Sequence, residues 1–173
     1  MEFYDVVKTR RSVRSYRSEM PPREALDRVM EAVRMAPSGS NRQPWRFILV
    51  TDAGKRRKLM ALCNNQGFVG EAPAVVVACG FDVGYNRGGY MGDKQFLVDV
   101  SIAFTHLVLA ARAEGLGTCW IGDFENDPVK ELLGVPDDWD VVAVSPLGYP
   151  KTDAFVETDR RKPLDEVVSW ERF

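Results

Sequence analysis

The chain has 173 residues, of which 45% are hydrophobic and 10% aromatic, a composition typical of folded globular proteins and unlike disordered or fibrous chains. Its 23 basic and 25 acidic side chains give a net charge of −2, so no overall positive charge would attract nucleic acid. The length predicts one domain over residues 1–173, large enough to bury a core without disulfides or metals.

The cysteines and the first residues exclude several classes of protein. Three widely separated cysteines form no CxxC pair and only one histidine accompanies them, so the usual ligand spacing of a zinc site is absent. The odd number indicates a reducing compartment. The acidic first residues are unlike a signal peptide, and the longest apolar run, 102–111, is about half a membrane span. We expect a cytoplasmic protein that holds no metal and binds neither nucleic acid nor a membrane.

The first half of the chain predicts helices and strands in alternation. A short helix is expected over residues 2–8 and a second over 23–35, entered through two prolines. In the second helix, apolar residues recur at the spacing of a face packed on a core; they are Leu26, Val29, Met30 and Val33. A strand over 47–50, a basic helix over 55–62 and a valine-rich strand over 74–78 follow.

The second half is dominated by one long helix. The glycine-rich segment 81–92 suits a loop or a lid. Residues 93–114 follow as a helix that is apolar around much of its circumference, so we expect it at the centre of the structure. A strand over 118–121, a small helix over 128–133 and a strand over 141–147 complete the predicted fold.

Familiar catalytic and nucleotide motifs are absent. No Walker phosphate loop occurs, and Gly115 and Gly117 with Gly122 depart from the dinucleotide spacing and lead from helix into strand. The one histidine, His106, lies on the apolar stripe of the long helix, where a structural role is favoured over proton transfer. Chemistry, if there is any, must therefore come from a bound cofactor.

Two basic clusters stand near opposite ends of the chain. Arg10 and Arg11 are followed by Ser12 and Arg14, and Arg161 lies between Arg160 and Lys162. The forked guanidinium donors of arginine, with a serine hydroxyl, suit a phosphate group. The alternative is an ordinary solvated surface, and for any single residue the sequence favours neither interpretation.

A loop of small and amide-bearing residues joins the second predicted helix to the first strand. It runs over residues 36–45, reading APSGSNRQPW. Backbone donors and amide side chains of this kind can approach a flat polar ring and bind its edge. Taken alone, the segment favours a plain connection between a helix and a strand.

Together, five motifs resemble the FMN-dependent nitroreductase family, of which this chain would be a short member. They are RRSVR at 10–14, APSGSNRQPW at 36–45, GLGTCWIG at 115–122, LGYP at 147–150 and RKPL at 161–164. Each motif is weak, but their order and spacing match from end to end. The resemblance implies an α+β fold, a three-layer α/β/α sandwich with a mainly antiparallel sheet, in an intertwined homodimer. It also implies that the tail, about 151–173, crosses onto the partner.

The resemblance assigns the arginine clusters to the cofactor. Arg10, Arg11 and Ser12 match positions that hold the FMN phosphate and ribityl chain, and Arg161 matches a further phosphate ligand. Arg14 matches a basic position near the pyrimidine edge of the flavin. There it would stabilise negative charge at N1 and the C2 carbonyl.

Two further segments complete the implied flavin site. Four positions match the loop that the other protomer contributes to the site in this family; they are Pro37, Ser38, Gly39 and Ser40. Asn41 is expected to order that loop. The backbone of Ile121 and Gly122 matches the segment that lies against the ring near N5.

The implied activity is that of an oxidoreductase with two FMN molecules shared between two chains. NAD(P)H would deliver hydride to FMN, and a nitroaromatic, quinone or related small acceptor would be reduced in turn, a ping-pong cycle. No catalytic side chain is required, because the flavin carries the chemistry. The chain is short for the family, so an active-site cover could be missing, with the segment 81–92 as its replacement. The physiological acceptor and the choice between NADH and NADPH stay open.

Alternative functions remain at this point. A specialised flavin reductase, dehalogenase or oxidase would keep the fold and the cofactor, and a non-catalytic FMN-binding redox module would lack turnover. Addition of NAD(P)H without oxygen separates a reductase from a binding module: rapid bleaching of the flavin favours a reductase, and no bleaching favours a binding module or an enzyme with a different electron donor.

Overall fold

The computed structural model describes residues 1–84, 91–158 and 160–173. Its helices are α1 (Phe3–Thr9), α2 (Arg23–Arg34), α3 (Ala53–Leu62), α4 (Gly67–Glu71), α5 (Gln95–Ala113) and α6 (Asn126–Leu133). Its strands are β1 (Trp45–Val50), β2 (Ala74–Gly80), β3 (Gly117–Thr118) and β4 (Asp140–Gly148). Short 3-10 turns are η1 (Gly39–Asn41), η2 (Gly92–Lys94) and η3 (Leu164–Glu166). Half of the segment 81–92, predicted as a loop or a lid, lies outside the described residues.

The four described strands form one sheet in the order β1-β2-β4-β3. Each ladder between neighbouring strands is antiparallel, with Phe47 opposite Ala78 and Val77 opposite Val144. Every residue of β2 is buried, because this central strand is covered on both faces. The predicted antiparallel sheet is therefore confirmed.

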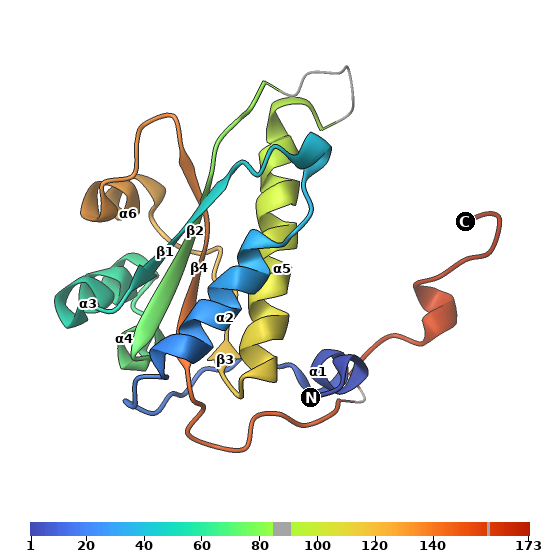
Figure 1. Ribbon diagram of the computed structural model, residues 1–173, viewed down its shortest axis with the longest axis horizontal. Coiled ribbons are helices and arrows are strands. Elements are labelled where there is room, and N and C mark those ends of the chain that lie inside the picture. Colours follow the sequence, from blue (N-terminus) through green and yellow to red (C-terminus); the bar gives the residue numbers. More distant parts are fainter. Residues whose placement is uncertain (85–90, 159) are drawn as a thin grey trace.

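Helices cover both faces of the sheet, as Figure 1 shows. On one face, α2 and α5 pack together and bury Val29, Val33, Ala103 and Leu107 with Val76 of β2. On the other face, α3, α4 and α6 enclose a second core that includes residues of β2 and β4. The result is the α/β/α sandwich that the resemblance implied.

The long helix α5 is the core helix of one layer. It begins after the 3-10 turn η2, and it ends before Gly115, whose φ of 73° supplies the left-handed residue of a helix terminus. The stretch Gly92–Ala113, with 22 residues and a window of hydropathy 1.6, has the length and composition of a membrane span. One face of it packs on α2 and the sheet, whereas Leu97 and Val98 on another face are exposed.

Two local features differ from the sequence prediction. The strand expected over 118–121 is shorter, because β3 ends at Thr118 and Ile121 returns only in an isolated bridge to Val144. Between them, the N–H of Cys119 donates to the Ser145 hydroxyl at 3.1 Å, so a side chain replaces the ladder partner. Helix α4 was not predicted, since its five residues are too few to show a period.

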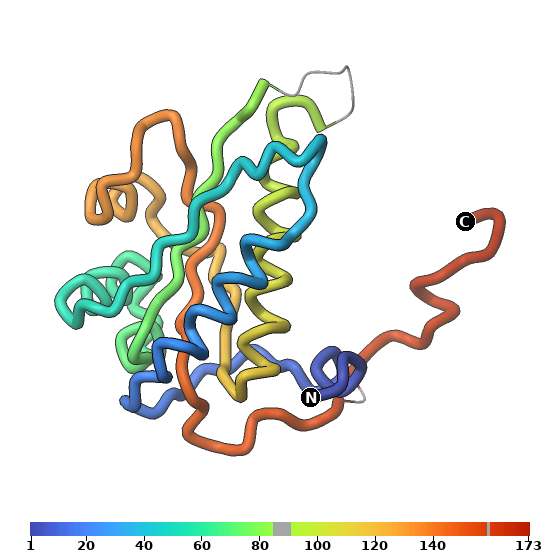
Figure 2. Tube along the Cα trace, in the orientation of Figure 1, coloured from blue at the N-terminus to red at the C-terminus, as the bar shows by residue number. Residues whose placement is uncertain are grey.

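The tail leaves the body of the chain. Figure 2 shows the last residues extending away from the sandwich, past α1. Every described residue from 160 to 173 is exposed, and Trp170 keeps 85% of its surface accessible. An apolar, aromatic end of this kind has no surface of its own chain to cover it.

Candidate functional site

The segment that carries the first arginine cluster lies beside β3. The N–H of Val13 donates to the Thr118 carbonyl at 2.9 Å, and Ser12 forms a parallel bridge with Thr118. Gly117 permits this approach, because a Cβ there would lie 2.6 Å from Val13 Cγ2. Val13 is buried while Ser12 and Arg14 are exposed, as expected when extended backbone alternates its side chains.

The structure brings the two basic clusters together. The pKa of Arg10 is lowered by burial first, then by the positive charges of Arg161 and Arg11. Arg11 donates through Nη1 to the Lys8 carbonyl at 2.9 Å. Its Nη2 is buried and has no hydrogen-bond partner in the part of the chain that is described. Crowded guanidinium groups with an unsatisfied donor form a site that an anion such as phosphate would complete.

A hollow of about 290 Å³ opens next to this cluster, lined by Arg10, Ser12 and Thr118 and by residues of α5. Trp120 forms its other wall, 44% exposed and packed edge-on against Phe104 with ring centroids 4.4 Å apart. The sequence analysis did not assign Trp120 a role. The signal that the sequence offered was a tryptophan inside the glycine-rich motif GLGTCWIG. The hollow therefore combines a cationic end with an aromatic wall.

The other residues predicted near the flavin ring are Ile121, Gly122 and Arg14. Both backbone groups of Ile121 are engaged, since its N–H donates to Val144 at 2.9 Å and its carbonyl accepts at 3.0 Å. Gly122, the next residue, is exposed. Arg14 lies close enough to Cys119 to oppose the rise in thiol pKa that burial causes there. Of the pair predicted to meet the ring through the backbone, Gly122 is the residue whose position suits a ligand contact.

The loop predicted to meet the flavin lies elsewhere. Gly39 donates its N–H to the Asp99 carboxylate near the start of α5, at 3.0 Å. The carbonyl and Oδ1 of Asn41 accept from the Gln43 side chain at 3.0 and 3.1 Å. The N–H of Gln43 in turn donates to the Ser38 hydroxyl at 2.9 Å. Asn41 is therefore part of the hydrogen-bond network within the loop, and Pro37 enters the loop as an exposed residue.

Within one chain, the loop and the arginine cluster do not meet. The loop contacts α5 at Asp99, whereas the hollow beside Arg10 reaches α5 at Thr105 and Leu109. Six to ten helical residues correspond to about 9–15 Å along the axis. Figure 1 shows the two segments at opposite ends of α5. Between them α5 presents a shallow hollow lined by Leu97, Val98, Ser101, Ile102 and Thr105.

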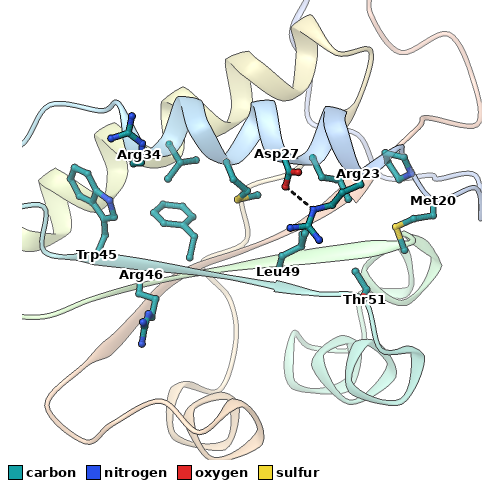
Figure 3. Close-up of a pocket in the computed structure, with 13 residues that line it drawn as sticks. Met20, Arg23, Asp27, Arg34, Trp45, Arg46, Leu49 and Thr51 are labelled. Atoms are coloured by element: carbon teal, nitrogen blue, oxygen red, sulfur yellow. Dashed lines mark hydrogen bonds and ion pairs between the residues drawn. The ribbon is translucent and has the colours of Figure 1, made fainter.

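A larger hollow, about 840 Å³, lies away from both, between α2 and the edge strand β1. Figure 3 shows Trp45 and Leu49 on β1 below α2, with the Arg23–Asp27 ion pair, 2.7 Å long, near Leu49. Its lining is largely apolar, so it suits a polypeptide segment better than a charged cofactor.

Comparison with known proteins settles the family. The model of the nitroreductase family matches residues 7–88 and 62–149. The chain belongs to the nitroreductase family. As a member it is an enzyme of the oxidoreductase class. Among its relatives is a protein of Archaeoglobus fulgidus named as an NADH dehydrogenase/NAD(P)H nitroreductase, 32% identical over 171 residues and 96% of each chain.

Solved structures of the nitroreductase family confirm the fold. A family protein from Clostridium novyi NT superposes with a TM-score of 0.79 at 33% identity, covering 91% of this chain and 89% of its own. The NADPH:FMN oxidoreductase of Vibrio harveyi, solved with NAD⁺, gives a TM-score of 0.85 at 27% identity, with 99% and 77% covered. Human iodotyrosine deiodinase 1 is also similar, 27% identical over 96% of this chain and 68% of its own.

Proposed function

We propose that this chain binds FMN non-covalently in a cytoplasmic homodimer and uses NAD(P)H to reduce nitroaromatic, quinone or related small acceptors by a ping-pong mechanism. The observation that carries the proposal is the convergence of Arg10, Arg11 and Arg161 beside a hollow with an aromatic wall. Each chain would form one domain, with its tail on the partner.

The residues of the site fit this cofactor. A phosphate monoester carries the charge that three crowded guanidinium groups require, and it would satisfy the buried Nη2 of Arg11. Ser12 offers a hydroxyl at the rim of the same hollow. The aromatic side chain of Trp120 suits a planar ring system.

When bound, FMN would accept hydride from NAD(P)H and pass electrons to the acceptor. The chain would bind, orient and polarise it. Arg14 would place positive charge by the pyrimidine edge, favouring the reduced anionic form, and Gly122 would face the ring with its backbone. His106 needs no catalytic role, since its Nδ1 lies 3.0 Å from the Ala32 carbonyl of α2.

A dimer would complete the site. Because the loop at 37–41 and the cluster at Arg10 lie at opposite ends of α5, a two-fold axis across the exposed face of this helix would bring one chain's loop to the other's arginines. That face carries Leu97, Val98 and Ile102. The larger hollow between α2 and β1 offers an apolar surface for the partner's tail, whose Trp170 is otherwise exposed to water.

The first test is cofactor extraction followed by reduction. The acid-released flavin should run as FMN, and NAD(P)H should bleach the bound flavin quickly without oxygen. Arg10→Glu should raise the FMN dissociation constant far more than Arg17→Glu, because Arg17 is exposed and lies outside the cluster. Recovery of FAD, no flavin after reconstitution, or equal effects of the two variants would contradict the assignment.

A second test asks whether two chains build each site. Arg10→Glu removes the phosphate ligand and Gly39→Trp blocks the loop, so each homodimer should be inactive. Refolded together, half of the dimers would be mixed, and in these one site would carry both lesions and the other neither. Roughly a quarter of wild-type sites should return, a fraction set by symmetry alone. A mixture that stays inactive would place both segments in the same chain's site.

The similarity to iodotyrosine deiodinase 1 over almost the whole chain supports a second candidate, reductive dehalogenation of an aromatic substrate. A turnover screen of nitroaromatic, quinone and halogenated phenol acceptors with the same reduced protein separates the two. A flavin that NAD(P)H does not bleach would instead favour a binding module.

A further inference from the structure

One buried carboxylate has no part in the proposed flavin chemistry. Asp99 lies one turn into α5 with 2% of its surface exposed, between the apolar residues Phe96 and Val100. It accepts the N–H of Gly39 at 3.0 Å and is 3.5 Å from Gln95 Nε2. Burying a carboxylate is unfavourable unless hydrogen bonds satisfy it, so the link to the loop is what makes this position tolerable.

The loop that donates this hydrogen bond contains several residues with positive φ. Ser40, Asn41 and Gln43 adopt φ values of 47°, 56° and 51°, in the left-handed region that residues with a Cβ seldom occupy. Such conformations persist only where the surroundings hold them. Hydrogen bonds within the loop supply part of that restraint, and Asp99 ties the loop to the rigid helix.

We infer that Asp99 is a positioning residue, which holds the loop 37–41 in the geometry that meets the flavin. The inference rests on the proposed function and deepens it, because this loop is the one proposed to contact the partner's FMN. A loop already held in its binding conformation loses less entropy when the ligand arrives. Asp99 would therefore raise FMN affinity without touching FMN.

The chemistry of the contact defines what a replacement must keep. The N–H of Gly39 needs an acceptor in the place of Oδ1. Asparagine retains that acceptor without the charge, whereas leucine has a similar size and no acceptor. Asp99→Asn should therefore preserve the loop, and Asp99→Leu should release it.

The experiment compares the two variants with Asp93→Leu, which removes an exposed carboxylate from the turn η2 before α5. Amide hydrogen exchange over residues 37–43 in the FMN-free protein should be about tenfold faster in Asp99→Leu, as expected when a charged acceptor is lost. In the same variant the FMN dissociation constant should rise about tenfold, and the visible circular dichroism of bound flavin should change. Asp99→Asn and Asp93→Leu should stay close to wild type in each measurement.

A second variant covers the case in which Asp99→Leu does not fold. Gly39→Pro removes the same hydrogen bond from the loop side without altering α5. Proline suits the first position of a helical turn, and Ser38 before it is extended (φ −145°, ψ 162°). It should also speed exchange over residues 40–43 in the FMN-free chain, and Asp99→Asn added to it should change nothing further.

The outcomes separate this inference from the proposed function. Unchanged exchange in Asp99→Leu, or in Gly39→Pro where the former does not fold, would show that Asp99 does not hold the loop. Faster exchange with unchanged FMN affinity and spectrum would show that the loop does not serve the flavin. Loss of affinity in Asp99→Asn equal to that in Asp99→Leu would make charge, and not positioning, the cause. A wild-type protein that binds no FMN would overturn the proposed function and this inference together.

Discussion

Replacing Arg161 by glutamine should affect the FMN-free and FMN-loaded protein in opposite directions. Arg161 is one of the charges that lower the pKa of Arg10, after burial. Without an anion, these guanidinium groups repel one another, so removing one charge reduces the repulsion and stabilises the FMN-free protein. With FMN bound, the same change removes a phosphate ligand. A charge on an ordinary protein surface would produce neither effect.

The two effects differ in size. Arg161 is exposed, so relief of repulsion should stabilise the FMN-free protein by at most about 1 kcal/mol. A lost charge-assisted hydrogen bond costs about 1.5–3 kcal/mol, equivalent to a tenfold or greater rise in the dissociation constant. At FMN a hundredfold above the wild-type constant, ligand stabilisation would fall from about 2.7 to about 1.4 kcal/mol. That difference corresponds to roughly 3–5 °C in Tm for a domain of this size.

The assay is thermal unfolding with and without FMN, together with a fluorescence titration of FMN. Arg160→Gln is the matched control, because Arg160 is the exposed neighbour and is not among the charges that lower the pKa of Arg10. Raising the salt concentration should reduce the gain in the FMN-free protein, because salt screens exposed charges. An FMN-free Tm that falls, or an FMN affinity that changes equally in both variants, would refute the argument.

Three further changes test the structure around the site. Gly117→Ala should destabilise the protein by about 1–3 kcal/mol and weaken FMN binding, since its Cβ would meet Val13; an unchanged urea midpoint would contradict the close approach. His106→Gln should leave flavin reduction within about threefold and cost about 1 kcal/mol of stability, and a thousandfold slower stopped-flow rate would assign it to catalysis. Burial raises the pKa of Cys63 and Cys79 from 9.0 to about 11, so stability is complete below pH 9 and falls between pH 9 and 11. Replacing either cysteine by alanine should reduce the slope of this decline in the free energy of unfolding by up to about 1.4 kcal/mol per pH unit for each thiol removed. Denaturant unfolding at several pH values measures it.

The sequence by itself determined the elements whose patterns are local. The apolar period of α2, entered at Pro22 and followed by Pro37, predicted its residues to within one position. The run of valines predicted the strand β2, because β-branched side chains favour extended backbone in a sheet, whereas the burial of all its residues depends on the helices that cover both faces. Helix α4 escaped prediction because five residues hold little more than one turn, and its position depends on neighbours and not on a period.

The chemistry of the site was decided in part by the sequence. The residue types, arginines with a serine and a loop of amides, suggested a phosphate and a planar ring but left a charged surface and a plain loop as alternatives, and the resemblance was needed to choose between them. That Arg10 and Arg161 converge could not be derived from their spacing, because the whole sandwich lies between them in the chain. The resemblance implied it, and the structure supplied the physical evidence: the pKa of Arg10 is lowered by burial and then by the charge of Arg161, and Arg11 carries a donor without a described partner.

Only the tertiary structure decided which groups can act on a ligand. Ile121 and Gly122 are adjacent in one motif, yet the bridge to Val144 occupies both backbone groups of Ile121 and leaves Gly122 at the surface. The sequence could not show this, because hydrogen-bond partners distant in the chain determine whether a backbone donor is available. The same holds for Asp99, which reads in the sequence as one acidic residue of an apolar helix. Its role depends on a loop sixty positions away, brought to it by the packing of η1 against the start of α5.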